Sequence, residues 1–390
     1  MHKKYIFIFV TLFLSGCQQA SIESLSQLSI DRPSFSMKST CETRSLQGKK
    51  FDSIWNRMRS GFCFRDIHSS RITEELKWMK SNKDFVYRSI ERSKPYLHHI
   101  LSYLEKRNLP HELALLPMVE SGFQPFAYSA SRAAGIWQFI PPTAREYGLK
   151  MNWLYDGRRD VLESTRAATY FLGDMHRHFK GNWLLAIASY NTGAGNVGKA
   201  IDKANKLFGK PSYWDLNLPR ETELYVPRLL ALSKIIYNPT RYGFNIPEIQ
   251  NKRFTQKVKI YDPIDFQTLS IITGLSISEL TKLNPGYSTW IIDPAQQNTL
   301  LLPNHVSKVF RQRYNNISKS IYKNKVHKVK KGDSLYKISR IYNVKINAIK
   351  KVNGLSKDII YINQKIRIPS EFTKIEKDFI TINKVKYYIN

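Results

Sequence analysis

Apolar residues recur mainly three and four positions apart between residues 51 and 250. This spacing places them on one face of a helix, which is the pattern of helices packed around a shared core. The clearest run combines Tyr96, Leu97, Ile100, Leu101 and Leu104. Similar runs predict further helices over residues 142–147, 164–179, 183–190, 197–207 and 222–237. We therefore expect an all-α domain over residues 51–250.

A carboxylic acid stands in an unusual place within this domain. Pro110 ends the preceding helix and suits the first turn of the next one, which Gly122 is placed to end. Glu120 therefore falls in the last turn of a short, largely apolar helix, beside Met118 and Val119. A carboxyl group among apolar side chains has a raised pKa and keeps its proton near neutral pH, as a general acid must.

The pattern changes after residue 251. Residues 256–261 alternate like a strand, two short helices follow, and residues 299–303 predict a second strand. The same plan recurs over residues 328–369. At a constant offset the two copies align Phe266 with Leu335, Leu269 with Ile338, Ile272 with Ile341, Leu275 with Val344, Leu280 with Ile349, Leu283 with Val352 and Asn284 with Asn353. We therefore expect two small β-α-α-β modules, over residues 256–303 and 325–370.

The segments that flank the second module carry little pattern. Residues 304–324 are rich in basic side chains and are expected to be a linker, and the tail over residues 371–390 alternates too weakly to receive a role. The whole chain contains 61 Lys and Arg against 31 Asp and Glu, a formal net charge of +30. Such an excess implies an anionic partner, which would be nucleic acid, an acidic membrane surface or a carboxylate-bearing polymer such as cell wall.

The N-terminus helps to choose among these partners. A basic start, the apolar stretch Tyr5–Leu14 and the small residues before Cys17 form an export signal, and export argues against nucleic acid. Leu14-Ser-Gly-Cys17 resembles the bacterial lipobox, whose cysteine is acylated. The next residue is Gln18 and not Asp, as in lipoproteins that are sorted to the outer membrane.

We therefore expect residues 1–17 to be a lipoprotein signal and residues 18–50 a flexible tether. The protein would then be anchored to the periplasmic face of the outer membrane by lipid on Cys17. No later segment approaches the ~20 apolar residues of a membrane-spanning helix. The alternative is an ordinary secretory peptide with an incidental cysteine.

The sequence does not call for a metal or a cofactor. Cys41 and Cys63 are too few for a Cys₄ zinc site, and an oxidising periplasm would permit a disulfide between them. His176 and His178 stand two apart on an expected helix and so project in different directions. Residues 193–198 match G-x-G-x-x-G, but they follow a helix and not a strand, which argues against dinucleotide binding.

Four segments resemble one known family. They are Glu120-Ser-Gly-Phe-Gln-Pro, Ala133-Ala-Gly-Ile-Trp-Gln-Phe-Ile-Pro-Pro-Thr-Ala-Arg145, Gly157-Arg-Arg-Asp160 and Ala188-Ser-Tyr-Asn-Thr-Gly-Ala-Gly195. Within residues 108–210 they resemble the transglycosylase SLT family. Near the C-terminus, Val329-Lys-Lys-Gly-Asp-Ser-Leu335, Asn353-Gly-Leu and Ile366-Arg-Ile-Pro369 resemble a peptidoglycan-binding LysM module. The resemblance implies a mainly α protein with a goose-type lysozyme-like fold, and its single catalytic glutamate falls on Glu120.

The resemblance also implies a reaction, the cleavage of MurNAc-β-1,4-GlcNAc bonds in peptidoglycan. Most glycosidases need a second carboxylate, but in this family the N-acetyl group of the substrate takes its place. Glu120 would protonate the leaving oxygen and then take the proton of the MurNAc 6-hydroxyl, which leaves a 1,6-anhydro-MurNAc end. Two alternatives stay open, a hydrolytic muramidase and a non-catalytic peptidoglycan-binding scaffold lipoprotein.

Further site residues follow from the same resemblance. Ser129 and Gln138 match positions that hydrogen-bond the glycan and peptide, and Tyr190 matches the tyrosine whose hydroxyl orients the glutamate. Asn191 is a candidate for lining the cleft. The alternatives are a turn serine, a surface glutamine and an ordinary core tyrosine. Trp137 would either stack on a sugar or pack in the core.

Some positions depart from the family pattern. Arg132 occupies a site often held by Gly, Ala194 occupies one often held by Glu or Pro, and residues 157–161 are less acidic than usual. These departures bear on subsite preference and not on the acid. LysM modules bind N-acetyl groups between their strand–helix and helix–strand loops. The first module has Pro263 where the second has Gly332, so its groove is expected to be lost. The sequence does not identify protein partners.

Overall fold

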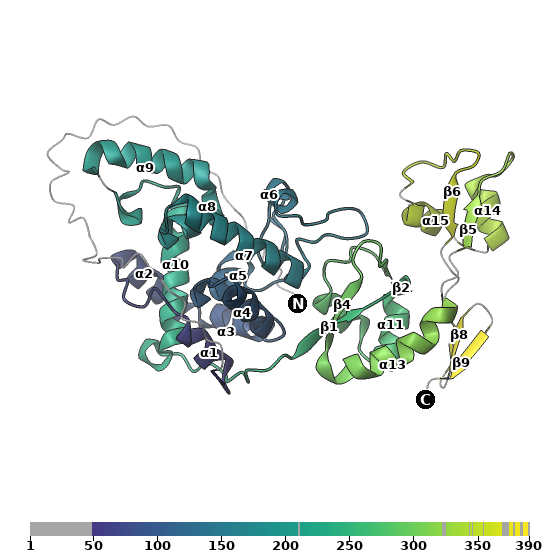
Figure 1. The fold of residues 1–390 in the computed structure, drawn as a ribbon, viewed down its shortest axis with the longest axis horizontal. Helices are drawn as coiled ribbons and strands as arrows, with labels where there is room; N and C mark the ends of the chain where they lie inside the picture. Colours follow the sequence, from purple (N-terminus) through teal and green to yellow (C-terminus); the bar gives the residue numbers. More distant parts are fainter. Residues whose placement is uncertain are drawn as a thin grey trace, which may run out of the picture.

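The computed structural model describes residues 49–209, 211–321, 325–342, 344, 346–353, 355–368, 374–376, 379–382 and 385–388. Its first part is a body of helices, which two smaller modules with short strands follow along the chain (Figure 1). The helices of the body are α1 (Ile54–Ser60), α2 (Ser70–Ser81), α3 (Lys83–Ser93), α4 (Leu97–Lys106), α5 (Leu116–Ser121), α6 (Pro141–Glu146), α7 (Val161–His178), α8 (Trp183–Thr192), α9 (Ala194–Phe208) and α10 (Arg220–Tyr237). Three 3₁₀ helices accompany them, η2 (His111–Leu115), η3 (Tyr213–Asp215) and η4 (Thr240–Tyr242).

Local capping signals set where these helices begin and end. The side chain of Asp160 accepts the backbone N–H groups of Leu162 and Glu163, so α7 begins three residues earlier than the apolar pattern predicts. Asn182 caps α8 in the same way. The predicted helices over residues 142–147, 183–190, 197–207 and 222–237 correspond to α6, α8, α9 and α10, with ends that differ by up to three residues. The all-α character of this part is confirmed.

A single apolar core runs through the helical body. Every residue of α8 from Trp183 to Ser189 is buried, and α7, α9 and α10 pack against this helix. The predicted stripe of α4 is also buried, with exposed fractions of 3% or less for Tyr96, Leu97, Ile100, Leu101 and Leu104. A helix that is buried on all sides gives its neighbours a rigid reference, and the site described below is built around this one.

Both small modules have the expected β-α-α-β plan. The first contains β1 (Thr255–Lys259), β2 (Ile264–Asp265), α11 (Phe266–Thr273), α12 (Ile277–Leu283), β3 (Ile291–Ile292) and β4 (Thr299–Pro303), with β1 antiparallel to β4 and β2 to β3. The second contains β5 (Lys325–Lys328), α14 (Leu335–Tyr342), α15 (Ile346–Asn353) and β6 (Lys365–Ile368), with β5 antiparallel to β6. The repeat alignment holds in the cores, because the aligned residues Leu269, Ile338, Leu280 and Ile349 are all fully buried.

Residues 304–321 form a helix, α13 (Asn304–Ile321), and not a linker. Val306, Phe310 and Tyr314 stand four positions apart and belong to the core of the first module. The linker prediction for residues 304–324 is therefore wrong for α13, because a narrow apolar stripe among basic residues is enough to pack this helix on the module. Residues 322–324 lie outside the described residues.

The C-terminal tail contains a small antiparallel sheet. Its strands are β7 (Lys374–Glu376), β8 (Phe379–Ile382) and β9 (Val385–Tyr388), paired in the order β7-β8-β9. The weak alternation noted in the sequence therefore corresponds to strands.

The predicted signal, Cys17 and nearly all of the tether lie outside the described residues, which begin at residue 49. Within the described part of the chain, no helix combines the length and the apolar character needed to cross a membrane. Cys63 is disulfide-bonded. Cys41, its expected partner, lies outside the described residues.

Candidate active site

Glu120 lies on α5, near the end of this short helix. The helix follows η2 directly, has Pro117 in its first turn, and ends at Gly122, whose φ of 57° places it in the left-handed region. Ser121 fastens this end to the next loop, because its hydroxyl donates to the carbonyl oxygen of Ile136 at 3.0 Å. Glu120 keeps part of its surface exposed. The site is therefore a carboxyl group held on a fixed helix end.

Two residues of α10 affect the pKa of this carboxyl. Tyr225 donates its hydroxyl hydrogen bond to Oε1 of Glu120. Desolvation raises the pKa of Glu120 to about 8, the hydrogen bond from Tyr225 opposes this rise, and the negative charge of Glu221 adds to it. Since desolvation is the largest of the three effects, the carboxyl is mostly protonated at neutral pH. The raised pKa expected from the sequence agrees with this result.

Tyr190 of α8 lies near Glu120 but points its hydroxyl elsewhere. It donates to the carbonyl oxygen of Trp137 at 2.8 Å. The expectation that the Tyr190 hydroxyl orients the carboxylate is therefore wrong in this structure, because Tyr225 makes that bond. After desolvation, the charge of Glu120 is the cause that raises the pKa of Tyr190. Trp137 itself is fully buried and donates from Nε1 to Thr165 at 2.9 Å, so it packs in the core.

Ser129 and Gln138 belong to one loop, which runs from residue 127 to residue 139 and which we call the site loop. The Ser129 hydroxyl accepts the backbone N–H of Ala133 at 3.0 Å and shares a hydrogen bond with Ser131 at 2.8 Å. Gln138 has a φ of 48° and donates from its amide nitrogen to the carbonyl oxygen of Gly135 at 2.7 Å. Both side chains hold the loop in shape, and both remain half-buried.

Asn191 connects the end of α8 with the start of α10. Its Oδ1 accepts the hydroxyl of Thr222 at 2.7 Å, and its Nδ2 donates to Oε1 of Glu221 at 3.2 Å. Glu221 is exposed, and its charge is one of those that raise the pKa of Glu120. Asn191 therefore orients a charge that acts on the candidate acid.

A raised pKa does not by itself single out Glu120. Burial also raises the pKa of Glu112 to about 7 and raises that of Asp160. Glu112 is fully buried, and its Oε1 accepts the backbone N–H groups of Cys63 and Phe64. Asp160 caps α7. Both groups have structural roles, whereas Glu120 combines a raised pKa with a partly exposed surface.

Sequence reasoning missed Tyr225. It stands inside the predicted helix 222–237 with the spacing of an ordinary core residue, and it is 4% exposed. Two glutamates and a proline surround it in Glu221-Thr-Glu-Leu-Tyr-Val-Pro227, an unusual setting for a tyrosine of a buried helix face. That setting is the sequence feature that could have identified Tyr225 as a candidate site residue. Among the described residues, no group of three or more His, Cys, Asp or Glu side chains could hold a metal ion.

Three segments of the chain match models of known families. Residues 100–211 match the transglycosylase SLT domain, residues 254–319 the LysM-like domain of lytic transglycosylase MltD, and residues 327–369 the LysM domain. We call residues 100–211 the SLT domain below, after this match. The SLT domain contains Glu120 and the other residues predicted for the site, while Tyr225 follows its matched end. Together with the helical body and the two β-α-α-β modules, this match confirms the expected mainly α, lysozyme-like fold class.

Two relatives carry related names. Membrane-bound lytic murein transglycosylase D of Escherichia coli is 44% identical over 219 residues, which are 56% of this chain and 48% of the relative. Membrane-bound lytic murein transglycosylase F of Shewanella baltica is 30% identical over 140 residues, which are 34% of this chain and 26% of the relative. The chain thus spans about half the length of the first relative and about a quarter of the second.

One solved structure is similar over part of the chain. It is an inactive variant of lytic transglycosylase Slt from Pseudomonas aeruginosa, with 19% identity, a TM-score of 0.31, and coverage of 48% of this chain and 32% of that chain. A score at this level does not relate the two folds element by element.

Proposed function

We propose that this chain is a lytic transglycosylase that cleaves the MurNAc-β-1,4-GlcNAc bonds of peptidoglycan and leaves 1,6-anhydro-MurNAc ends. The observation that carries the proposal is the state of Glu120 within the SLT domain, because desolvation raises the pKa of its carboxyl to about 8 while the residue stays partly exposed. The names of the two relatives, both lytic murein transglycosylases, support the same reaction.

In the proposed mechanism Glu120 acts twice. It first donates its proton to the glycosidic oxygen while the bond between this oxygen and C1 of MurNAc breaks. Its carboxylate then takes the proton of the 6-hydroxyl of the same MurNAc, and the 6-oxygen forms a bond to C1. No water is consumed, and Glu120 ends protonated as it began. The N-acetyl carbonyl of the substrate would support the positive charge at C1 in place of a second carboxylate.

Tyr225 has a defined role in this cycle. Between the two proton transfers Glu120 is an anion in a largely desolvated place, which is costly unless a donor faces it. The hydroxyl of Tyr225 already donates to Oε1, and this hydrogen bond favours the ionised form, as its lowering effect on the pKa shows. Tyr225 therefore stabilises the state in which Glu120 can act as a base.

Other parts of the chain would bind the polymer. We assign Ser129, Gln138 and Asn191 to the glycan and its peptide, because these half-buried polar side chains belong to the SLT domain. The second module, over residues 325–370, would hold peptidoglycan near the enzyme and raise its local concentration. The catalytic unit would comprise residues 51–250.

The location follows from the same relationship. The relatives are named membrane-bound, and we propose that this chain is likewise a membrane-associated enzyme of the periplasm. Lipid on Cys17 would anchor it to the periplasmic face of the outer membrane, with the following residues as tether. Metabolic labelling with a fatty-acid analogue tests this, since Cys17→Ser should remove the label and release the protein from membranes.

Product analysis tests the reaction. Purified sacculi digested with the chain should yield anhydro-MurNAc ends by mass spectrometry, and Glu120→Gln should abolish them. Glu74→Gln, the same change on an exposed glutamate of α2, is the matched control and should digest like the unaltered chain. Reducing MurNAc ends would establish a hydrolytic muramidase, and equal turnover by Glu120→Gln would establish a non-catalytic scaffold.

The pH profile tests the state of the acid. Because the protonated form starts the reaction, activity should persist through neutral pH and decline as pH rises through about 8. Tyr225→Phe removes the hydrogen bond that lowers the pKa, so this decline should move to higher pH. A hydrogen bond to a charged group contributes ~1.5–3 kcal/mol, so the rate should also fall by about 10- to 100-fold.

Glu221→Gln should move the decline in the opposite direction. It removes a charge that raises the pKa of Glu120, so activity should be lost at lower pH than in the unaltered chain. The shift should shrink as salt is added, because Glu221 is exposed. Shifts of the same sign for Tyr225→Phe and Glu221→Gln would contradict the proposed roles.

A further inference from the structure

The first module is joined to the SLT domain by backbone hydrogen bonds. The loop over residues 150–160, here called the clamp loop, faces the helix–strand loop of the module. The N–H of Asp156 donates to the carbonyl oxygen of Gly286 at 2.7 Å, and the N–H of Ser288 donates to that of Leu154 at 2.9 Å. Paired bonds of this kind fix one backbone against another in a single register.

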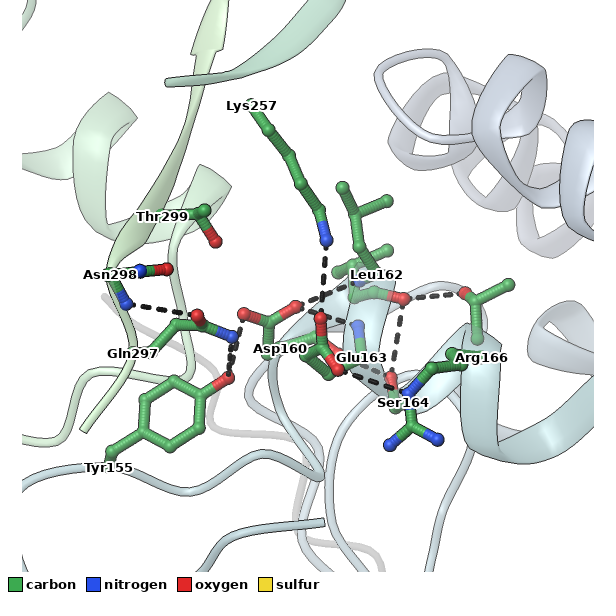
Figure 2. Close-up of polar contacts among 12 residues, drawn as sticks. Tyr155, Asp160, Leu162, Glu163, Ser164, Arg166, Lys257, Gln297, Asn298 and Thr299 are labelled. Atoms are coloured by element: carbon green, nitrogen blue, oxygen red, sulfur yellow. Dashed lines mark hydrogen bonds and ion pairs between the residues drawn. The ribbon is translucent and has the colours of Figure 1, made fainter. Parts of the chain in front are cut away.

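Buried side chains surround these bonds. Tyr155 and Tyr287 form the bridged pair, with ring centroids 5.4 Å apart and exposed fractions of 2% and 8%. The hydroxyl of Tyr155 donates to Oδ2 of Asp160 at 2.8 Å, and Lys257 of the module lies 3.2 Å from Glu163 of α7 (Figure 2). The contact therefore has a packed interior with an ion pair beside it, as a permanent interface does.

Gly286 shows how closely the two parts approach. A Cβ atom at this position would lie 2.8 Å from Cε2 of Tyr155 and 3.1 Å from Cβ of Asp160. Distances this short leave no room for a side chain. The close seating of the module on the clamp loop thus depends on a glycine.

The other side of the clamp loop reaches the site loop. The carboxylate of Asp156 accepts Nε and Nη2 of Arg158 at 2.9 and 2.8 Å, a two-point pairing that fixes the guanidinium. Nη1 of Arg158 then donates to the carbonyl oxygen of Arg132 at 2.6 Å. Arg158 is 7% exposed, so this bridge is shielded from water.

Gly135 of the site loop packs closely against the backbone of Arg158. A Cβ atom there would lie 2.1 Å from the carbonyl oxygen of Arg158. The carbonyl oxygen of Gly135 in turn accepts the side-chain amide of Gln138. Contacts therefore run without interruption from Gly286 through Asp156 and Arg158 to Gln138.

We propose that the first module is a brace that positions the site loop for catalysis. It holds Asp156, Asp156 holds Arg158, and Arg158 holds the loop that carries Ser129 and Gln138. This inference rests on the proposed transglycosylase function for its catalytic consequence, whereas the bracing itself does not depend on the reaction. Asp156, Arg158 and Gly286 are positioning residues, because none of them would touch the substrate.

Two single variants of the full chain and their combination test the brace. Gly286→Ala should disturb the seating of the module. Asp156→Asn keeps the backbone N–H that reaches Gly286 but weakens the hold on Arg158. Because small displacements near a reacting centre cost up to ~10²-fold, each variant should lower kcat on sacculi by about tenfold. The double variant should be no worse than the single ones, since both act through one chain of contacts.

A structural readout accompanies the kinetics. Amide hydrogen exchange should increase over residues 127–139 in both variants and stay unchanged in α8. Gly198→Ala is the matched control, since a Cβ there meets no heavy atom within 4 Å, and it should change neither measurement. Multiplying effects in the double variant, unchanged exchange in the site loop, or an unchanged kcat would each overturn the brace.

The design separates the two proposals. If the unaltered chain produces anhydro ends but Gly286→Ala and Asp156→Asn leave kcat intact, the brace fails and the transglycosylase stands. If no anhydro ends form, the proposed reaction fails, and hydrogen exchange in the site loop still decides whether the brace exists.

Discussion

The two β-α-α-β modules share a plan but differ in how much of their surface other parts of the chain cover. Ile272 and the aligned Ile341 are 1% and 56% exposed. Ile272 belongs to α11, which α13 covers, with Arg313 of α13 donating to the Ile272 carbonyl oxygen at 3.2 Å. In the helix–strand loop of the first module Tyr287 is 8% exposed and bridged to Tyr155, whereas the aligned Ser356 of the second module is exposed.

The strand–helix loops of the two modules also differ in the contacts that hold them. In the second module the side chain of Asp333 accepts the N–H of Lys330 at 2.8 Å and pairs with His327 at 2.7 Å. The aligned positions of the first module are Val258 and Ile264, both 1% exposed. There the turn is held instead by Tyr314 of α13, whose hydroxyl accepts the N–H groups of residues 261 and 262 at 2.9 Å.

This difference shows how two modules with one plan can have different surroundings, since the first is packed against other parts of the chain and, among the described residues, the second is not. In the first copy the clamp loop contacts the helix–strand loop, and Tyr314 of α13 contacts the strand–helix loop. Both loops remain accessible in the second copy. The loss of the first groove, expected from Pro263, stays a prediction, and the contacts of these loops with other parts of the chain support it.

The largest effect is expected when the side chain that packs α13 onto the first module is truncated. Phe310 is fully buried and stacks on Tyr314 with ring centroids 5.0 Å apart. Phe310→Ala should destabilise the first module by ~3–5 kcal/mol, measured by calorimetry of the full chain. Val309→Ala, a change at the exposed neighbouring position, should alter stability by less than about 0.5 kcal/mol. Equal, small effects would mean that α13 is a linker after all.

The aligned isoleucines provide the next test. Ile272→Ala should cost ~2–5 kcal/mol because it leaves a cavity, whereas Ile341→Ala should change stability by less than about 0.5 kcal/mol because that side chain is exposed. Unfolding followed by hydrogen exchange, module by module, measures both. Similar costs at the two positions would show that the second module also covers this face.

The smallest expected effect is a loss of stability of the second module at acidic pH. Hydrogen bonds from Lys330 and His327 lower the pKa of Asp333 to about 2. A lowered folded-state pKa stabilises the fold above the ordinary value near ~4, and this contribution disappears as pH falls toward 2. The second module should therefore lose stability in this interval, and Asp333→Asn should remove that dependence. The first module has Ile264 at this position and lacks this contribution, so an acid response of the second module that Asp333→Asn leaves unchanged would refute the assignment.

Much of the fold was predictable from the sequence. Apolar spacing predicted α4 and α6–α10, Gly122 predicted the end of α5, and the repeat offset predicted the paired cores of the modules. These features are local, because capping and periodicity act within a few residues. α13 was missed because its stripe of Val306, Phe310 and Tyr314 is sparse among basic residues.

The site was predictable in part. Glu120 could be chosen because its apolar neighbours along the chain already indicate a desolvated carboxyl. The sequence could not show which tyrosine donates to Glu120, since Tyr190 and Tyr225 lie 70 and 105 positions away along the chain and both come near the carboxyl in the fold. Only the orientation of α8 and α10 decides which hydroxyl meets the carboxylate.

The chain order of residues thus determined the helices, the repeated modules and the candidate acid, because each depends on neighbours within a turn or a strand. The tertiary structure decided which tyrosine serves Glu120 and which module is fixed to the SLT domain. These outcomes depend on contacts between segments far apart in the chain, such as Tyr155 with Tyr287, where packing and close approach select one arrangement among many that the same local pattern allows.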